Sequence, residues 1–338
     1  MRASRYSFSM RPTAGKLLKS ANLPAFLITS THNIRYCTGV TASVGALLAL
    51  PRGFALFLDG RYTEEAQTSL LPGVRLYHQR SLQKFFSSIR RCGIEADDCS
   101  CARYIRLQNT FLNTKFVQKE GVVEHFRRSK DPRELRKIHR ADRITLELLR
   151  RVPAVLKKGM TERALAWKLA QWAVELGAER LAFDPIVAFG AHTSHPHHHP
   201  TSMGLRKGHI VQIDVGAVYQ GYCSDRSAVY FTAKPTPEQE RVYVAVQDAK
   251  AAAERMVAPG VTTHALDAAA RTVLARAGIE EAFVHALGHG VGLEVHEGVT
   301  LSRKAKNQSL LSGEVIAIEP GAYFPGKFGM RLESIVFV

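Results

Sequence analysis

Two segments, one ending at Asp214 and the other at Glu319, repeat each other and constrain the fold more than any other feature of the chain. The first reads GHIVQIDVGA and the second GEVIAIEPGA, and a further acid follows each, Asp225 and Glu333 respectively. The apolar runs IVQI and VIAI predict strands that run inward, each with an acid at its end. A buried carboxylate is costly unless a cation or hydrogen bonds compensate it. The repeat therefore predicts a duplicated domain with four acids directed at one interior.

The repeat extends to the helices that precede these strands. Gly159-Met-Thr-Glu162 and Gly260-Val-Thr-Thr263 each predict a helix start. The stretches between the paired acids contain Gly-rich turns and predict hairpins, which bring both carboxylates of a pair to one point. The repeat is too long for a solenoid unit, so we interpret it as two face-to-face halves related by a pseudo-twofold axis.

A second domain precedes the repeat. From Ala25 to about Val123, short apolar segments such as AFLITS, GALLALP and GFALFLDG alternate with turn signals, as in an α/β domain. Asp131-Pro132 then predicts a helix start, with an N-cap and a proline at the first position, and a helix toward Leu149. We expect domains over residues 1–130 and 131–338 of an α/β (α+β) protein.

The first twenty residues contain no acid and several basic residues. We interpret residues 1–20 as a flexible extension, with organelle targeting as a minor alternative and a cytoplasmic location as the main expectation. In a further alternative, KLLKSANLP forms the first helix of the domain.

Composition narrows the class of protein. The net charge is +16, and eight Lys or Arg against three acids lie in the run RRSKDPRELRKIHRADR. Without interleaved aromatic residues or a nucleic-acid motif, we interpret this run as a solvated helix face and expect no nucleic-acid partner. The cysteines are five, an odd number, and include no CxxC pair. We therefore expect free thiols, which are typical of proteins in a reducing compartment. No apolar span is long enough to cross a membrane, and none is expected.

The acids and His289 predict a metal centre, and the two glycines beside His289 are small neighbours that would let a metal approach closely. Four carboxylates and one imidazole suit Mn, Co, Fe or Zn better than Mg or Ca. Five ligands are too many for one tetrahedral zinc but suit two ions that share bridging carboxylates. Such a pair would generate hydroxide near neutral pH, and a bridging glutamate would carry a proton to the leaving nitrogen. The chemistry predicted is amide hydrolysis.

The histidine-rich stretch HTSHPHHH, residues 192–199, is a weaker signal. Such a compositional cluster could bind stray metal, and we expect most of its side chains to have no specific role. His285 and His289 are spaced as in zincin helices but lack the glutamate of the HExxH motif, so a zincin site is rejected.

Taken together, these segments resemble the aminopeptidase P and prolidase branch of the pita-bread metallopeptidases, whose wider family includes methionine aminopeptidase and creatinase. The resemblance covers nearly the whole chain and rests on FDPIVAFGAHTSHPHHHP, IDVGAVYQGYCSD, HALGHGVGLEVHEG and IEPGAYFPGKFGMRLES. The stretch NIRYCTGVTASVGALLAL is similar to the creatinase-type N-terminal domain, which methionine aminopeptidases lack. The resemblance implies such an N-terminal domain followed by a pita-bread catalytic domain.

The resemblance also implies roles for individual residues. The implied metal ligands are Asp214, Asp225, His289, Glu319 and Glu333, and all five are present, unlike in metal-free creatinase. His197 and His296 match substrate-site histidines that stabilise the intermediate. His285 matches a histidine lining the proline pocket, and Arg331 an arginine beside the last ligand. Glu319 is also counted among the catalytic residues. Two divalent ions per subunit, manganese first and cobalt or zinc as alternatives, and a homodimer are implied.

Some positions depart from the family pattern. His192 stands where Asn is frequent, and Arg226-Ser-Ala-Val229 replaces Ile-Thr-Arg-Thr after Asp225, although Ser227 keeps a hydroxyl. The sequence stops at Val338, soon after Glu333, so we expect an abbreviated C-terminus with reduced packing around Glu333.

Three functions follow as hypotheses. The leading one is a Xaa-Pro aminopeptidase acting on peptides with proline second. The alternative in the same class is prolidase, restricted to Xaa-Pro dipeptides. The high net charge and the altered residues after Asp225 suggest a third, a catalytically weakened relative that acts as a binding module, but such a module has no need for four converging acids.

Overall fold

The structure, a computed structural model, describes residues 11–338 and divides into two compact units, the N-terminal unit up to Arg127 and the C-terminal unit Arg128–Val338. Within the described residues, no helix is long and apolar enough to cross a membrane. The extension predicted over residues 1–20 lies partly outside the described residues. Its later part is wrong, because Ala14–Ala21 form helix α1, whose first turn is capped by Thr13. KLLKSANLP thus contributes to the first helix, as the alternative stated.

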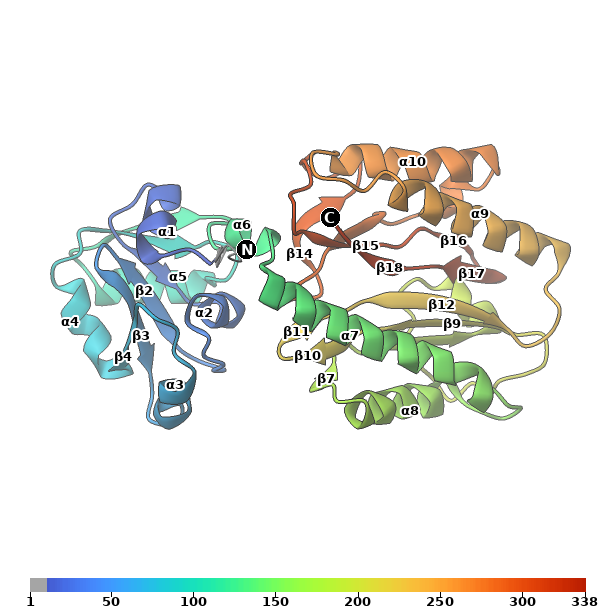
Figure 1. The fold of residues 1–338 in the computed structure, drawn as a ribbon, viewed down its shortest axis with the longest axis horizontal. Helices are drawn as coiled ribbons and strands as arrows, with labels where there is room; N and C mark the ends of the chain where they lie inside the picture. The colour runs from blue at the N-terminus through green and yellow to red at the C-terminus, as the bar shows by residue number, and fades with distance from the viewer. Residues whose placement is uncertain (1–10) are drawn as a thin grey trace, which may run out of the picture. The chain divides into compact units, whose positions relative to one another are not determined.

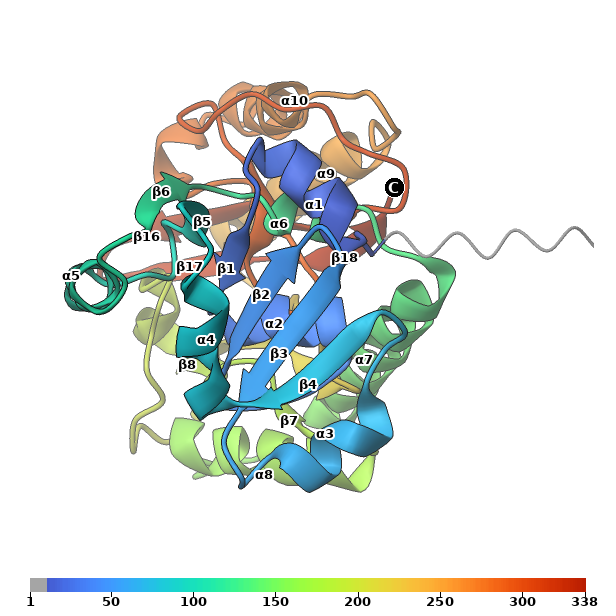
Figure 2. The same cartoon turned by 90° about the vertical axis from the view of Figure 1, so that its left-hand side faces the viewer.

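A six-stranded sheet in the order β4-β3-β2-β1-β5-β6 forms the centre of the N-terminal unit. Figure 2 shows β2, β3 and β4 side by side in this sheet. The apolar segments that predicted strands are confirmed, and the turn at Pro51-Arg52 joins two antiparallel neighbours. The strands are β1 (Phe26–Ile28), β2 (Ala46–Leu50), β3 (Gly53–Leu58), β4 (Val74–His78), β5 (Arg91–Glu95) and β6 (Lys115–Lys119).

Short helices connect these strands, and apolar side chains from both kinds of element fill the core. Leu27, Leu48, Phe57 and Ile94 are buried there. The helices are α2 (Thr31–Thr38), α3 (Thr63–Ser69), α4 (Leu82–Phe86), α5 (Cys101–Thr110) and α6 (Glu124–Arg128).

The first half of the C-terminal unit begins with helix α7 (Pro132–Arg151). Its start is confirmed, because Asp131 accepts hydrogen bonds from the backbone of the first turn and Glu134 bonds back to Asp131. Helix α8 (Glu162–Glu175) follows, capped by Thr161. The strands are β7 (Arg180–Leu181), β8 (Ile186–Phe189), β9 (Ile210–Val215), β10 (Ala217–Tyr219), β11 (Tyr222–Cys223) and β12 (Arg226–Phe231).

The second half repeats this order. Helices α9 (Pro237–Glu254) and α10 (Thr263–Arg276) precede the strands, and Thr262 caps α10 as Thr161 caps α8. The strands are β13 (Gly288–Gly290), β14 (Glu297–Leu301), β15 (Val315–Ile318), β16 (Gly321–Phe324), β17 (Phe328–Arg331) and β18 (Ser334–Phe337). The main sheets are ordered β12-β9-β8 in the first half and β14-β13-β15-β18 in the second.

The duplication is visible in the packing of the two halves. In Figure 1, α7 and α8 lie on one side of the strands and α9 and α10 on the other. Each helix pair packs on its own core, one containing Ile213 and the other Ile318. Equivalent isolated bridges, Thr161 with Gly204 and Thr262 with Ser309, tie each second helix to its half. The predicted pseudo-twofold domain is confirmed.

Candidate active site

The four acids lie at equivalent places on two strand pairs. In the first half, β9 pairs antiparallel with β12 so that Asp214 is opposite Ser227, and Asp225 directly precedes β12. In the second, β15 pairs with β18, with Glu319 directly after β15 and Glu333 directly before β18. The acids are thus held by strand ends rather than by free loops, which fixes their positions.

His289 completes the set from the short strand β13. Two groups of donor atoms, Asp214, Asp225 and Glu333 in one and His289, Glu319 and Glu333 in the other, each lie within 4.8 Å of one another. Glu333 belongs to both groups, so these two groups share one carboxylate, and Asp225 and His289 form a further group with His296.

Two observations fit this donor set to divalent cations. Within the described residues, the buried atoms Asp214 Oδ1 and Asp225 Oδ1 have no hydrogen-bond partner. The Nδ1 atom of His289 bonds to the carbonyl of Gly290 at 3.1 Å, so the proton is on Nδ1 and Nε2 faces the acids, 3.7 Å from Asp225 and from Glu319. A neutral imidazole held in this tautomer is the usual form of a metal ligand.

The electrostatics of the acids without a cation are unfavourable. Burial, followed by the neighbouring carboxylates, raises the pKa of Asp225 and of Glu333 well above the usual range. Burial also raises the pKa of Glu319 to about 8. These shifts mean that the ionised acids need positive charge, which Arg331 supplies only in part.

The glycines beside His289 have a packing role that differs from the expected one. We predicted that small neighbours would let a metal approach. A Cβ atom at Gly288 would instead lie 1.9 Å from the carbonyl oxygen of Ala317, and one at Gly290 would lie 2.1 Å from that of Glu297. Glycine is required here because the backbones of neighbouring strands are in close approach.

Arg331 connects the two halves at the site. It is 2% exposed, and its guanidinium donates to Asp214 Oδ2 at 2.5 Å and to Ser227 Oγ at 3.0 Å. Its backbone is bound by the side chain of Gln212, which accepts from the Arg331 amide at 2.7 Å and donates to its carbonyl at 3.1 Å. Gln212 is the polar residue of the apolar run IVQI, and its partner in the folded chain is the backbone of Arg331.

Arg331 also reaches His285 through Tyr323. It donates to the hydroxyl of Tyr323 at 2.8 Å, and that hydroxyl lies 3.0 Å from Nε2 of His285. The His285 Nδ1 atom bonds to the carbonyl of Ala286 and so carries the proton. Burial and the charge of Arg331 lower the pKa of His285 to about 4, so His285 is neutral and accepts from Tyr323. Tyr323 was missed by sequence reasoning, although it lies in the motif IEPGAYF.

All the predicted site residues line one cavity of about 690 Å³. His197 and His296 are exposed on its wall, and the ring of His296 is 3.9 Å from that of His289. The expected reduction of packing around Glu333 is not found, since Glu333 is 4% exposed and β18 is paired with β15 along its length. Ser227 holds Glu333 by a hydrogen bond of 2.8 Å. The site therefore combines ordered acids with histidines open to a ligand.

Comparisons with known proteins place the chain among peptidases. Residues 136–338 match the model of metallopeptidase family M24, and residues 11–129 match the creatinase/prolidase N-terminal domain. An uncharacterized peptidase of Bacillus subtilis, YqhT, is 31% identical over 95% of this chain and 93% of its own length.

Two solved structures are similar over nearly their full lengths. The prolidase from Pyrococcus horikoshii has a TM-score of 0.90 at 30% identity and covers 96% of this chain and 94% of its own. The X-Pro aminopeptidase from Thermotoga maritima has a TM-score of 0.86 at 32% identity, with 94% of each chain covered.

Proposed function

The chain belongs to metallopeptidase family M24, in its aminopeptidase P and prolidase branch, and from this premise we propose that it is a Xaa-Pro aminopeptidase. It would release the first residue of a peptide whose second residue is proline. The observation that carries the proposal is that four acids, three of them buried and Glu319 half-buried, line one cavity together with His289, in a chain that also has the creatinase-type N-terminal domain.

We propose that Asp214, Asp225, His289, Glu319 and Glu333 hold two divalent ions, with manganese as the expected metal. The support is the shared position of Glu333, the unpartnered carboxylate oxygens and the tautomer of His289. When bound, two such ions would supply Lewis acidity that lowers the pKa of a water molecule and polarises the scissile carbonyl. We also propose a homodimer, which the resemblance implies, and a cytoplasmic location, which the free cysteines favour.

The remaining side chains have roles that follow from their contacts. Ser227 and Arg331 fix the carboxylates of Glu333 and Asp214 by hydrogen bonds. Glu319, whose carboxyl lies at the cavity wall, would take a proton from water and transfer it to the leaving proline nitrogen, which must gain a proton when the tertiary amide is cleaved. His197 and His296 would donate hydrogen bonds to the oxygen of the tetrahedral intermediate.

The alternative in the same class is prolidase, favoured by the likeness to the Pyrococcus enzyme. The test is hydrolysis of Arg-Pro-Pro and of Ala-Pro by metal-stripped protein, with and without added Mn²⁺, alongside the Asp225→Asn variant. We expect Mn²⁺-dependent release of Arg from the tripeptide and its loss in the variant. Cleavage of the dipeptide alone would establish prolidase instead. No turnover of either peptide by folded, Mn²⁺-supplied protein would contradict both and favour the binding module.

A further inference from the structure

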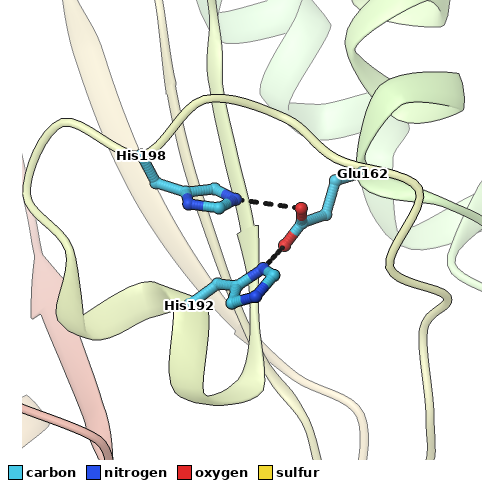
Figure 3. A group of neighbouring side chains, drawn as sticks. All are labelled: Glu162, His192 and His198. Carbon is cyan, nitrogen blue, oxygen red and sulfur yellow. Dashed lines mark hydrogen bonds and ion pairs between the residues drawn. The ribbon is translucent and has the colours of Figure 1, made fainter.

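A second cluster of potential ligands lies at the start of α8, apart from the four acids and His289 described above. Figure 3 shows His192 and His198 converging on the carboxylate of Glu162. Nδ1 of His192 is 2.9 Å from Oε1, and Nε2 of His198 is 2.9 Å from Oε2. The rings of the two histidines are 4.5 Å apart between centroids, and three donor atoms of the cluster lie within 4.8 Å of one another.

The carboxylate of Glu162 is fixed without help from the histidines. Its side chain is fully buried, and Oε1 accepts from the Phe189 amide at 2.9 Å. Oε2 accepts from the amide and the hydroxyl of Thr201 at 2.9 and 2.6 Å. Hydrogen bonds from Thr201 and His198 outweigh the effect of burial and lower the pKa of Glu162, so the group is ionised. An oriented, charged carboxylate of this kind is typical of a supported metal ligand.

We propose that Glu162, His192 and His198 form a binding site for one divalent transition-metal ion of the zinc class, separate from the site of the five predicted ligands. Two imidazole nitrogens and one carboxylate oxygen are a usual ligand set for zinc, with a water molecule in the fourth position. The side chain of His192 is 26% exposed, which leaves the cluster open to an ion and to that water.

Binding requires the donor atoms to rearrange around the ion. A tetrahedral ion with bonds of about 2.1 Å separates its ligand atoms by about 3.4 Å, and the three donor atoms of the cluster lie within 4.8 Å of one another. Each ring would present to the ion the nitrogen that now faces Glu162, with its proton on the other ring nitrogen.

An ion at this position would affect the main cavity. His198 follows His197 in the chain, and both line the cavity that holds the five predicted ligands. The ion would bind two points of the segment 190–200 to the start of α8. The position of His197 would then depend on occupancy of the new site.

The test is equilibrium dialysis of the metal-stripped full chain against Zn²⁺, with conservative variants that keep the hydrogen bonds. His192→Asn and His198→Gln each place an amide N–H near the nitrogen they replace, but lack an imidazole ligand. His199→Ala is the matched control, because His199 is an exposed histidine of the same stretch and outside the cluster. We expect the wild type and His199→Ala to bind one equivalent more than either amide variant.

This difference does not depend on how many ions the five predicted ligands hold, nor on peptide hydrolysis. Anomalous scattering from crystals grown with Zn²⁺ should then place the extra ion between Glu162 and the two histidines. Equal binding by the wild type and the folded amide variants would overturn the proposal. The cluster would then serve only to hold the segment 190–200 to α8 by hydrogen bonds. An equal loss in His199→Ala would also overturn it, since exposed histidines would then account for the binding. Should His198→Gln fail to fold, His192→Asn carries the test, because its side chain is partly exposed.

Discussion

The two halves of the C-terminal unit have the same frame but different chemistry at equivalent positions. Thr161 and Thr262 cap α8 and α10 in the same way, and the next residue is Glu162 in the first half but Thr263 in the second. Glu162 is a charged group bound by two histidines, whereas Thr263 exchanges neutral hydrogen bonds with Gln308 and Asn307. A duplicated backbone frame thus tolerates divergence of the side chains placed on it.

The main site shows the opposite relation, because there the halves complement each other. The first half supplies two aspartates and the second two glutamates and His289, and Arg331 of the second half binds Asp214 of the first. Neither half contains a complete donor set. Four predictions test this division of roles, in order of decreasing expected effect.

The largest effect should come from pH in the metal-free protein. The pKa of Glu319 is raised from 4.5 to about 8 by burial, and those of Asp225 and Glu333 are also raised. The folded state therefore keeps protons that the unfolded chain has lost, so stability present at low pH is lost as pH rises from about 4.5 to about 8. Each pKa unit corresponds to about 1.4 kcal/mol.

Urea unfolding of metal-stripped protein across this pH range measures the effect. Added Mn²⁺ should abolish the decline, since a cation stabilises the ionised acids. If the free energy of unfolding of the stripped protein stays constant with pH, the buried acids do not destabilise the metal-free fold when they ionise.

Replacement of Arg331 by Met should be the next largest change. It removes the positive partner of Asp214 and leaves a buried charge unpaired, which typically costs about 3–5 kcal/mol. The metal-free protein should lose this stability in urea unfolding, and Arg331→Lys should lose less because it keeps the charge. Equal losses in both variants would mean that hydrogen-bond geometry, rather than charge, joins the halves.

Asp225→Asn and Glu333→Gln compare one acid from each half. Both should reduce kcat/KM on a Xaa-Pro peptide by at least about 100-fold, since even outer groups around a metal contribute 10–100-fold. A large loss in one variant and a small loss in the other would show that one half carries the reaction. Circular dichroism of each variant serves as the control for folding.

The smallest effects should come from the residues that differ between the helix starts. Glu162→Gln removes a charged acceptor of several bonds and should cost about 2–3 kcal/mol, whereas Thr263→Val removes one neutral acceptor and should cost about 1 kcal/mol. Thermal unfolding of both variants measures the difference. Similar costs would indicate that the charged hydrogen bonds of Glu162 stabilise the fold no more than the neutral ones of Thr263 do.

Much of this arrangement could be predicted from the sequence because the duplication repeats local signals. Asp131-Pro132, Gly159-Met-Thr and Gly260-Val-Thr specify helix starts through capping chemistry, and the runs before Asp214 and Glu319 specify strands by their apolar residues. The residues that the resemblance marked as metal ligands line one cavity.

Other features could not be predicted because they depend on contacts between residues distant in sequence. Tyr323 is joined to His285 only in the folded chain, and Gln212 finds Arg331 across the two halves. From sequence alone the histidine-rich stretch is interpreted as a compositional cluster, because Glu162 lies about thirty residues earlier. In the folded chain, Glu162 binds His192 and His198 of this stretch.

The pair formed by Gln212 and Arg331 has a consequence for the order of folding. Their bonds join residues 119 positions apart, whereas β9 and β12 are joined by a short connection. Contacts between residues so far apart in sequence require a large loss of chain entropy to close the loop, so they tend to form after local hairpins. We expect the halves to fold first and to meet last at this pair. Stopped-flow kinetics of Gln212→Ala should then show faster unfolding with nearly unchanged refolding.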